Sequence, residues 1–155
     1  MKYIQLDHYP FEYTVNFGDE SDAGMDLRSA AAYDIQLKPG EDYVFPTGLK
    51  IHIASDETPL PEYFGLFGMI VPRSGLGFKH YTRLANTAGI IDSEYKGEIM
   101  VKIRNEGDSD LTIKRGERMC QMIFTPYLKQ VNLQPVNEFD GEDTRGAGFG
   151  SSGRM

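Results

Sequence analysis

The chain has no tryptophan, one cysteine and three histidines among 155 residues. A single cysteine, Cys120, excludes an intrachain disulfide and metal clusters built on several thiolates. Its place in the apolar run RMCQMIF predicts a buried strand residue without a catalytic role. The histidines His8, His52 and His80 lie in separate segments, too poorly spaced for zinc or for a serine triad with Ser74. The HxE and PCxxC signature of zinc deaminases is missing as well.

Long apolar runs and an excess of positive charge are also missing. No stretch reaches the roughly eighteen apolar residues of a membrane span, and the polar start MKYIQLDHYP lacks the apolar core of a signal peptide. We therefore expect a cytoplasmic protein, in a host cytoplasm if the gene is viral, and no membrane partner. The net charge of −7 disfavours direct nucleic-acid binding, so an anionic ligand would need a local cationic site.

Short β-forming runs fill most of the chain, without a long helical period. The length suggests one domain, and 40% hydrophobic content is enough for a core. The expected strands lie in YTVNF (13–17), YDIQL (33–37), YVFPTGLKIHI (43–53), YFGLFGMIV (63–71), LTIKR (111–115) and MCQMIFTPYL (119–128). We expect turns at KPGED and PTG and a loop over 54–64. This pattern predicts an all-β sandwich or jelly roll.

The most informative segment is LANTAGIIDSEYKGEIMVKIRN, residues 84–105. LANTAGII and EIMVKIRN are rich in β-formers and SEYKG supplies a turn, so two antiparallel strands should flank a tight connection. Backbone groups left unpaired where the ladder opens could bind a pyrimidine edge, with Tyr95 packed on a sugar. In the simpler interpretation, Asp92 only caps a turn and Tyr95 only packs on a sheet.

The segment VPRSGLGFKH (71–80) suggests an anion site directly after a strand. Arg73 offers a fork of donors for phosphate oxygens, Ser74 adds a hydroxyl, and Gly75 allows close backbone approach, especially if a short helix begins there. A turn that carries one surface arginine is the simpler alternative.

The chain ends in TRGAGFGSSGRM (144–155), whose composition is that of a flexible tail. A loop that closes over a nucleotide would use Arg145 on phosphate and Phe149 on a base, and glycine-rich backbone can bind phosphate through its N–H groups. We therefore divide the chain into a β domain over 1–140 and a glycine-rich arm over 141–155.

Five segments together resemble the ordered motifs of the trimeric dUTP pyrophosphatases, or dUTPases. They are SDAGMDL (21–27), PRSGLGFKH (72–80), NTAGIIDSEYKGEI (86–99), KRGERMCQMIF (114–124) and RGAGFGSSG (145–153). They occur in the family's order and spacing. The resemblance implies a jelly-roll-like distorted barrel, assembled as a homotrimer with shared active sites. The third motif of one subunit would meet the first, second and fourth of a neighbour and the fifth of the third chain.

The family's reaction is Mg²⁺-dependent hydrolysis of dUTP to dUMP and pyrophosphate, which keeps uracil out of DNA and supplies dUMP for thymidylate synthesis. The resemblance makes Asp92 the base that activates water for in-line attack on the α-phosphorus. Asp26 would reach the metal through water, with Mg²⁺ held mainly by substrate phosphates; a structural ion pair of Asp26 with Arg118 is the alternative. The expected substrate-binding residues are Arg73, Ser74, Gly75, Asn86, Gly89, Tyr95, Met100, Gln121, Arg145, Phe149, Gly150 and Ser151.

Selectivity for deoxyuridine would follow from shape and from polar groups left unpaired by other bases. Asn86 and the backbone of Gly89 and Met100 would read the uracil edge. Tyr95 would exclude a ribose 2′-hydroxyl by contact, and Phe149 would stack on the base from the third subunit.

The sequence departs from the family pattern in two places. The fifth motif is one glycine shorter than the commoner RGxGGFGSSG, which puts the rate of catalysis in doubt. Glu94 stands where many members carry aspartate, a change expected to have little effect.

Two kinds of alternative function stay open. One is a dCTP deaminase, or a bifunctional deaminase and pyrophosphatase, of the same fold; Asp92, Tyr95 and the phenylalanine-bearing tail argue against it. The other is a regulatory nucleotide-binding module that has lost catalysis or acts through an added partner. The region 53–64 is where a partner surface would lie, although a solvated loop is the simpler reading.

Overall fold

The computed structural model describes residues 1–15, 19, 21–53, 60–129, 131–138 and 140–141. Within them the chain forms, in order, β1 (Lys2–Gln5), β2 (Met25–Arg28), β3 (Ile35–Leu37), β4 (Asp42–His52), β5 (Phe64–Pro72), α1 (Ser74–His80), β6 (Thr82–Leu84), β7 (Gly89–Ile91), β8 (Glu98–Asn105), β9 (Leu111–Ile113) and β10 (Arg118–Leu128). In this described part, no helix has the length and apolar character needed to span a membrane.

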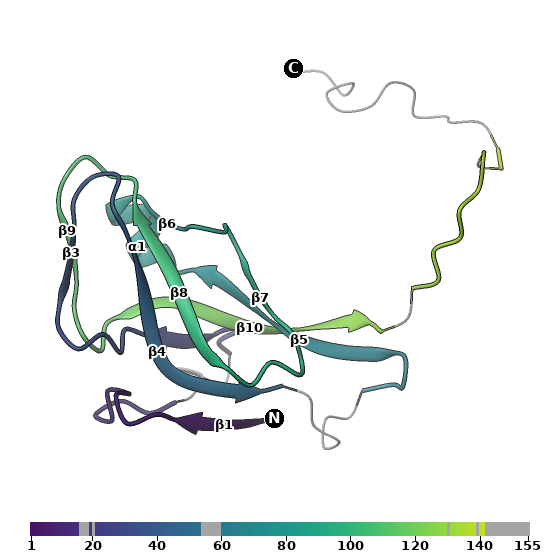
Figure 1. Ribbon diagram of the computed structural model, residues 1–155, viewed down its shortest axis with the longest axis horizontal. Helices are drawn as coiled ribbons and strands as arrows, with labels where there is room; N and C mark the ends of the chain where they lie inside the picture. The colour runs from purple at the N-terminus through teal and green to yellow at the C-terminus, as the bar shows by residue number, and fades with distance from the viewer. Residues whose placement is uncertain (16–18, 20, 54–59, 130, 139, 142–155) are drawn as a thin grey trace.

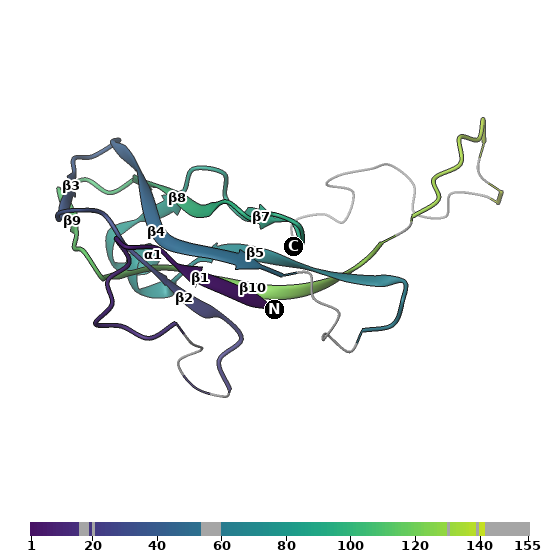
Figure 2. The same cartoon turned by 60° about the horizontal axis from the view of Figure 1, so that its bottom comes forward.

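The strands form two four-stranded sheets and one two-stranded sheet. The first sheet has the order β1-β4-β8-β6 and the second the order β2-β10-β5-β7, while β3 pairs with β9. All pairings in the described residues are antiparallel. The two larger sheets lie one over the other, and the β3/β9 pair projects beyond them (Figures 1 and 2). The fold is therefore all-β, as the sequence predicts.

The apolar core lies between the two larger sheets and also includes buried side chains of the β3/β9 pair, namely Ile35, Leu37, Leu111 and Ile113. In β8 the side chains of Ile99, Val101 and Ile103 are buried, whereas Met100 between them is exposed. This alternation follows from the two-residue period of a strand, which turns successive side chains to opposite faces. The segments that carry the candidate site are thus attached to a packed core.

Cys120 is fully buried in β10, as predicted. Desolvation raises the pKa of its thiol far above the ordinary range, and the nearby Asp26 carboxylate raises it further. The thiol is therefore neutral at physiological pH and unsuited to nucleophilic chemistry.

Most strand predictions are confirmed, by β3, β4, β5, β9 and β10. The strand expected over 13–17 is wrong for its described part, because residues 13–15 form no strand. The turn expected at PTG is also wrong: Pro46, Thr47 and Gly48 lie inside β4, where the register with β8 shifts between Pro46 and Lys50. Part of the predicted loop over 54–64 lies outside the described residues.

The hairpin predicted within 84–105 is wrong in its pairing. β7 pairs with β5, with Gly89 opposite Ile70, so it belongs to the second sheet. β8 belongs to the first sheet, where its partner from this segment is the short β6, with Leu84 opposite Ile103. The chain therefore leaves one sheet after Leu84, crosses to the other, and returns through the turn at 92–97.

Candidate functional site

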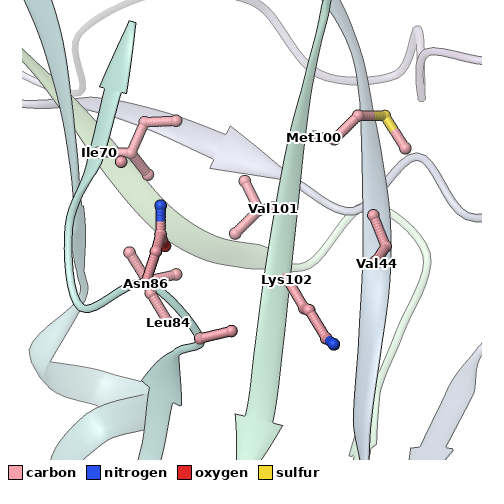
Figure 3. A pocket seen from close by; sticks show the side chains of 9 residues that line it. Val44, Ile70, Leu84, Asn86, Met100, Val101 and Lys102 are labelled. Atoms are coloured by element: carbon pink, nitrogen blue, oxygen red, sulfur yellow. The ribbon is translucent and has the colours of Figure 1, made fainter.

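A cavity of about 340 Å³ lies where β6 gives way to β7 beside β8. Its size is within the range of small-molecule sites. Three residues expected to read a uracil edge line it, namely Asn86, Gly89 and Met100. In Figure 3 the Asn86 amide lies between Ile70 and Val101. The remaining lining residues are Val44, Leu84, Ala85 and Lys102.

The backbone between β6 and β7 explains the opening. Thr87 has a positive φ of 63°, and the Ala88 N–H donates to the Asn86 carbonyl at 2.6 Å, which makes a tight turn. The Ala85 N–H still donates to the Lys102 carbonyl at 2.9 Å, but beyond it no strand pairing in the described chain joins β7 to β8. The described chain therefore has a gap between β7 and β8, which belong to different sheets, in place of the predicted hairpin ladder.

A second cavity, of about 760 Å³, lies at the start of α1. Three residues expected on the phosphate path line it: Arg73, Ser74 and Gln121. A short helix, which the sequence suggested only as a condition for the anion site, is present: α1 begins at Ser74 after an extended Arg73. Gly75 lies in α1 but is not among the lining residues, and a Cβ built on it would meet nothing within 4 Å. The other lining residues are Pro72, Gly77, Phe78 and Tyr81.

Asp26 forms ion pairs with two arginines beside this second cavity. Its Oδ1 lies 3.0 Å from Arg73 Nε and its Oδ2 lies 3.2 Å from Arg118 Nη1. The strand register explains the contact, because β2 and β10 pair with Asp26 opposite Gln121. The ion pair with Arg118, which the sequence left open as an alternative, is present.

The side chains beside the second cavity determine how a metal ion could bind there. Among the described residues, no group of three or more His, Cys, Asp or Glu side chains could hold an ion. Mg²⁺ usually keeps several waters and binds one or two carboxylates together with substrate phosphates. Both oxygens of Asp26 are engaged by arginines, so this carboxylate has no free oxygen for direct ligation, and only a contact through water is compatible with it.

Asp92 and Tyr95 lie on the turn between β7 and β8. The Tyr95 N–H donates to the Asp92 carbonyl at 3.0 Å, and the Tyr95 hydroxyl donates to the Glu98 carbonyl at 2.8 Å. Asp92 is exposed, and within the described chain its carboxylate has no hydrogen bond or ion pair. Neither side chain lines either cavity.

The two cavities share no lining residue, so the predicted residues fall into separate groups on one chain. Asn86, Gly89 and Met100 lie at the first cavity, and Arg73, Ser74 and Gln121 lie at the second. The expected residues of the arm, Arg145, Phe149, Gly150 and Ser151, lie outside the described residues.

Sequence reasoning missed the neighbours of the turn. His8 and His52 lie in separate segments of the sequence, yet His8 Nε2 is 2.8 Å from Glu98 Oε1 and His52 Nε2 is 3.5 Å from Glu94 Oε2. These contacts depend on the sheet order β1-β4-β8, which joins residues about 40 to 90 positions apart. No local pattern in the sequence could have indicated them.

Comparison with known proteins gives matches over most of the chain. A family model described as dUTPase matches residues 14–153. The deoxyuridine 5'-triphosphate nucleotidohydrolase of Serratia proteamaculans is 45% identical over 132 residues, which cover 85% of this chain and 81% of that protein. The protein of the same name from Hahella chejuensis is 42% identical over 137 residues, covering 88% and 84%.

Solved structures show the same fold. The Staphylococcus bacteriophage 80alpha dUTPase with dUPNHPP has a TM-score of 0.78 at 25% identity, and the match covers 99% of this chain and 98% of that one. The dUTPase from phage phi11 of S. aureus has a TM-score of 0.71 at 20% identity, covering 91% and 98%.

Proposed function

The chain belongs to the dUTPase family, and we propose on that basis that it hydrolyses dUTP to dUMP and pyrophosphate. The observation that carries the proposal is the grouping of the motif residues around two cavities, one lined by Asn86, Gly89 and Met100 and the other by Arg73, Ser74 and Gln121. The first group offers neutral hydrogen-bonding groups for a base, and the second offers a cation and polar groups for phosphates.

In the first cavity, the base would be recognised through its edge. The Asn86 amide offers both a donor and an acceptor, and the backbone of Gly89 and Met100 borders the gap between the strands. Cytosine would place a donor against a donor, and the methyl group of thymine would collide with the backbone. Tyr95 would pack under the deoxyribose and exclude a 2′-hydroxyl by contact.

In the second cavity, Arg73 and the Ser74 hydroxyl would bind phosphate oxygens, and Gln121 would contact the same phosphate chain. Gly75 has no side chain, so a phosphate oxygen could come close to its backbone. Asp26 fixes the Arg73 guanidinium at 3.0 Å and would contact Mg²⁺ through water. When bound, Mg²⁺ supplies charge neutralisation and a fixed shape to the triphosphate.

Asp92 would be the general base. Its carboxylate takes a proton from a water molecule as that water attacks the α-phosphorus, and the bond from this phosphorus to the bridging oxygen breaks in line. The bridging oxygen leaves with pyrophosphate, and dUMP keeps the oxygen that came from water. The exposed carboxylate, without a partner among the described residues, is available for this role.

A complete site would need more than one subunit. The two cavities share no lining residue, and Asp92 lines neither, which supports a site shared between subunits. In the homotrimer that the family resemblance implies, one subunit would supply the base cavity with Asp92, and a neighbour would supply Arg73, Ser74 and Gln121. Arg145, Phe149, Gly150 and Ser151 of the third chain would close over the nucleotide. The product dUMP would serve thymidylate synthesis, and removal of dUTP would keep uracil out of DNA.

The test is release of pyrophosphate and ammonia from dUTP, dCTP, dTTP and UTP with Mg²⁺. We expect pyrophosphate from dUTP alone, and a fall in kcat of about 10²- to 10⁴-fold in Asp92→Asn. Asp108→Asn, in another exposed turn, is the matched control and should keep full activity. Ammonia from dCTP would identify a deaminase instead, and binding without turnover would identify a regulatory nucleotide-binding module.

A further inference from the structure

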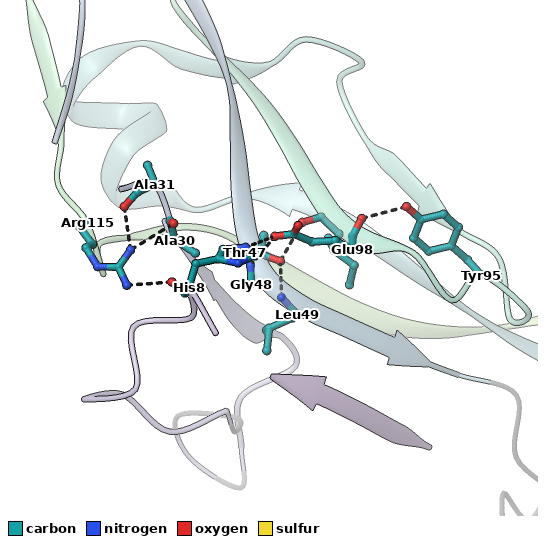
Figure 4. Close-up of polar contacts among 10 residues, drawn as sticks. His8, Ala30, Ala31, Thr47, Gly48, Leu49, Tyr95, Glu98 and Arg115 are labelled. Carbon is teal, nitrogen blue, oxygen red and sulfur yellow. Dashed lines mark hydrogen bonds and ion pairs between the residues drawn. The ribbon is translucent and has the colours of Figure 1, made fainter. Parts of the chain in front are cut away.

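Glu98 connects the turn at 92–97 to a distant part of the chain (Figure 4). Its Oε1 lies 2.8 Å from His8 Nε2 and accepts a hydrogen bond from the Gly48 N–H, also at 2.8 Å. Its backbone carbonyl accepts the Tyr95 hydroxyl at 2.8 Å. One residue therefore contacts Tyr95 through its main chain and His8 through its side chain.

The bulge in β4 supplies the backbone N–H group that donates to the Glu98 carboxylate. Gly48 has a φ of 68°, and its N–H falls where the β4–β8 register shifts. The Glu98 carboxylate binds this N–H, and the Thr47 hydroxyl donates to the Ile99 carbonyl at 2.8 Å. The start of β8 is thus fixed to the bulge by two hydrogen bonds from side chains.

The position of His8 is fixed independently of Glu98. The Arg115 guanidinium donates to the His8 carbonyl at 2.8 Å and to the Ala31 carbonyl at 2.8 Å (Figure 4). The next residue, Tyr9, is buried against the bulge, where a Cβ on Gly48 would lie 2.8 Å from Tyr9 Cα. His8 is therefore presented to Glu98 by an ordered backbone.

Tyr95 packs closely over the end of the turn. A Cβ on Gly97 would lie 2.5 Å from the Tyr95 hydroxyl oxygen, so the ring occupies the space that a side chain there would take. The contact of Glu94 with His52, at 3.5 Å, lies on the more exposed side of the turn, where Glu94 keeps 72% of its side-chain surface exposed. Glu98, with 22% exposed, is the stronger anchor.

We propose that His8 and Glu98 are positioning residues that hold Tyr95 in the orientation needed to distinguish deoxyribose from ribose. This proposal rests on the dUTPase function proposed above. His8 holds the Glu98 carboxylate, Glu98 holds the Tyr95 hydroxyl, and the ring then keeps a fixed distance from the sugar. Loss of the His8 contact loosens the turn and weakens discrimination against a 2′-hydroxyl.

The experiment compares His8→Ala, the conservative His8→Gln and the control His80→Gln with the unmodified chain. His80 is exposed at the end of α1 and lines neither cavity. Thermal unfolding checks that each variant folds. Calorimetry measures binding of dUMP and of UMP, and hydrogen exchange followed by mass spectrometry measures protection of the 92–98 peptide.

In His8→Ala, we expect faster exchange in this peptide and a fall of about tenfold in the preference for dUMP over UMP. His8→Gln should restore much of both, because its amide can donate to Glu98, and His80→Gln should change neither. An unchanged preference in His8→Ala would overturn the proposal, whether or not exchange changes.

The binding preference is measured without hydrolysis, which separates the two proposals. A chain that prefers dUMP but releases no pyrophosphate from dUTP would contradict the proposed reaction while leaving the role of His8 to be decided by the variants. A chain that releases pyrophosphate from dUTP but shows no preference for dUMP over UMP would overturn the role of His8 and Glu98 while leaving the proposed reaction in place.

Discussion

Arg73 Nε and Asp26 Oδ1 lie 3.0 Å apart, so an arginine expected to bind phosphate is held by a carboxylate from β2, two strands away in the sheet. The same carboxylate binds Arg118 at 3.2 Å through its other oxygen. The pairing of β10 with both β2 and β5 brings these segments together. The ion pair orients the Arg73 guanidinium before any ligand arrives, which lowers the entropy cost of binding a phosphate.

The substitution Asp26→Asn should therefore raise the KM for dUTP by about tenfold, because Arg73 loses a charged partner. Arg118→Gln breaks the other ion pair and leaves the contact between Asp26 and Arg73, so its KM should change less. Steady-state kinetics at several Mg²⁺ concentrations provides the measurement. Equal KM values in the two variants would contradict this role, and a changed Mg²⁺ requirement in Asp26→Asn alone would support a water-mediated metal contact.

Gly48→Ala should destabilise the fold by about 2 to 4 kcal/mol. The positive φ of 68° is unfavourable for alanine, and the new Cβ would lie 2.8 Å from Tyr9 Cα. Urea unfolding measures the loss. Gly75→Ala is the matched control: its Cβ meets nothing within 4 Å and lies in a helix, so the free energy of unfolding should stay equal or rise slightly. A small effect of Gly48→Ala would show that the bulge can relax.

Cys120 should not react with a thiol reagent until the chain unfolds. Burial raises the pKa of its thiol, so the folded state keeps the proton while the unfolded thiol ionises above roughly pH 8.5. This group therefore contributes stability below that pH, and the contribution decreases as the pH rises. Labelling with a chromogenic disulfide at increasing urea measures access. Rapid labelling of the folded chain would contradict the burial.

The buried amide of Asn105 should tolerate little change. Its Nδ2 donates to the Leu37 and Ser109 carbonyls at 2.9 Å each, and its Oδ1 accepts the Gly107 N–H at 3.0 Å. Asn105→Asp would turn a carboxylate oxygen toward two carbonyls and cost roughly 3 kcal/mol or more. Thermal and urea unfolding provide the measurement, with the exposed Asn132→Asp as control. Equal stability of the two variants would show that the amide bonds contribute little.

Local sequence was sufficient for the strands that carry strong β-forming runs, such as β5 and β10. Prediction from local sequence failed where a strand forms by pairing with a residue range far away in the chain, or where side-chain packing determines the local structure. β1 was missed because three of its four residues are exposed, and it forms by pairing with β4, with Lys2 opposite His52. The strand expected from Tyr13 does not form over its described residues, 13–15. The Tyr13 ring instead lies 4.0 Å from the Arg28 guanidinium in a cation–π contact.

In the candidate site, too, local sequence predicted some features, whereas others depend on the tertiary fold. The motif residues that line the two cavities could be named from the sequence because each motif is a continuous segment. The side chains themselves also indicate different ligands, since the Arg73 guanidinium is a cation suited to phosphate and the Asn86 amide is a neutral group suited to a base. Their pairing across sheets was not predictable, since β7 joins β5 rather than the nearer β8. The contact between His8 and Glu98 spans 90 positions and follows only from the finished fold.

The separation of the two cavities has a genetic consequence if neighbouring subunits complete each site. A chain with Arg73→Ala and a chain with Asp92→Asn would each be inactive alone. When both are expressed in one cell, a fraction of mixed assemblies would combine an intact Asp92 from the first with an intact Arg73 from the second. Two defective alleles of this gene would then partly complement each other. One defective allele beside a normal copy would reduce activity only in proportion to its share of the protein, because each site takes the affected residue from a single subunit.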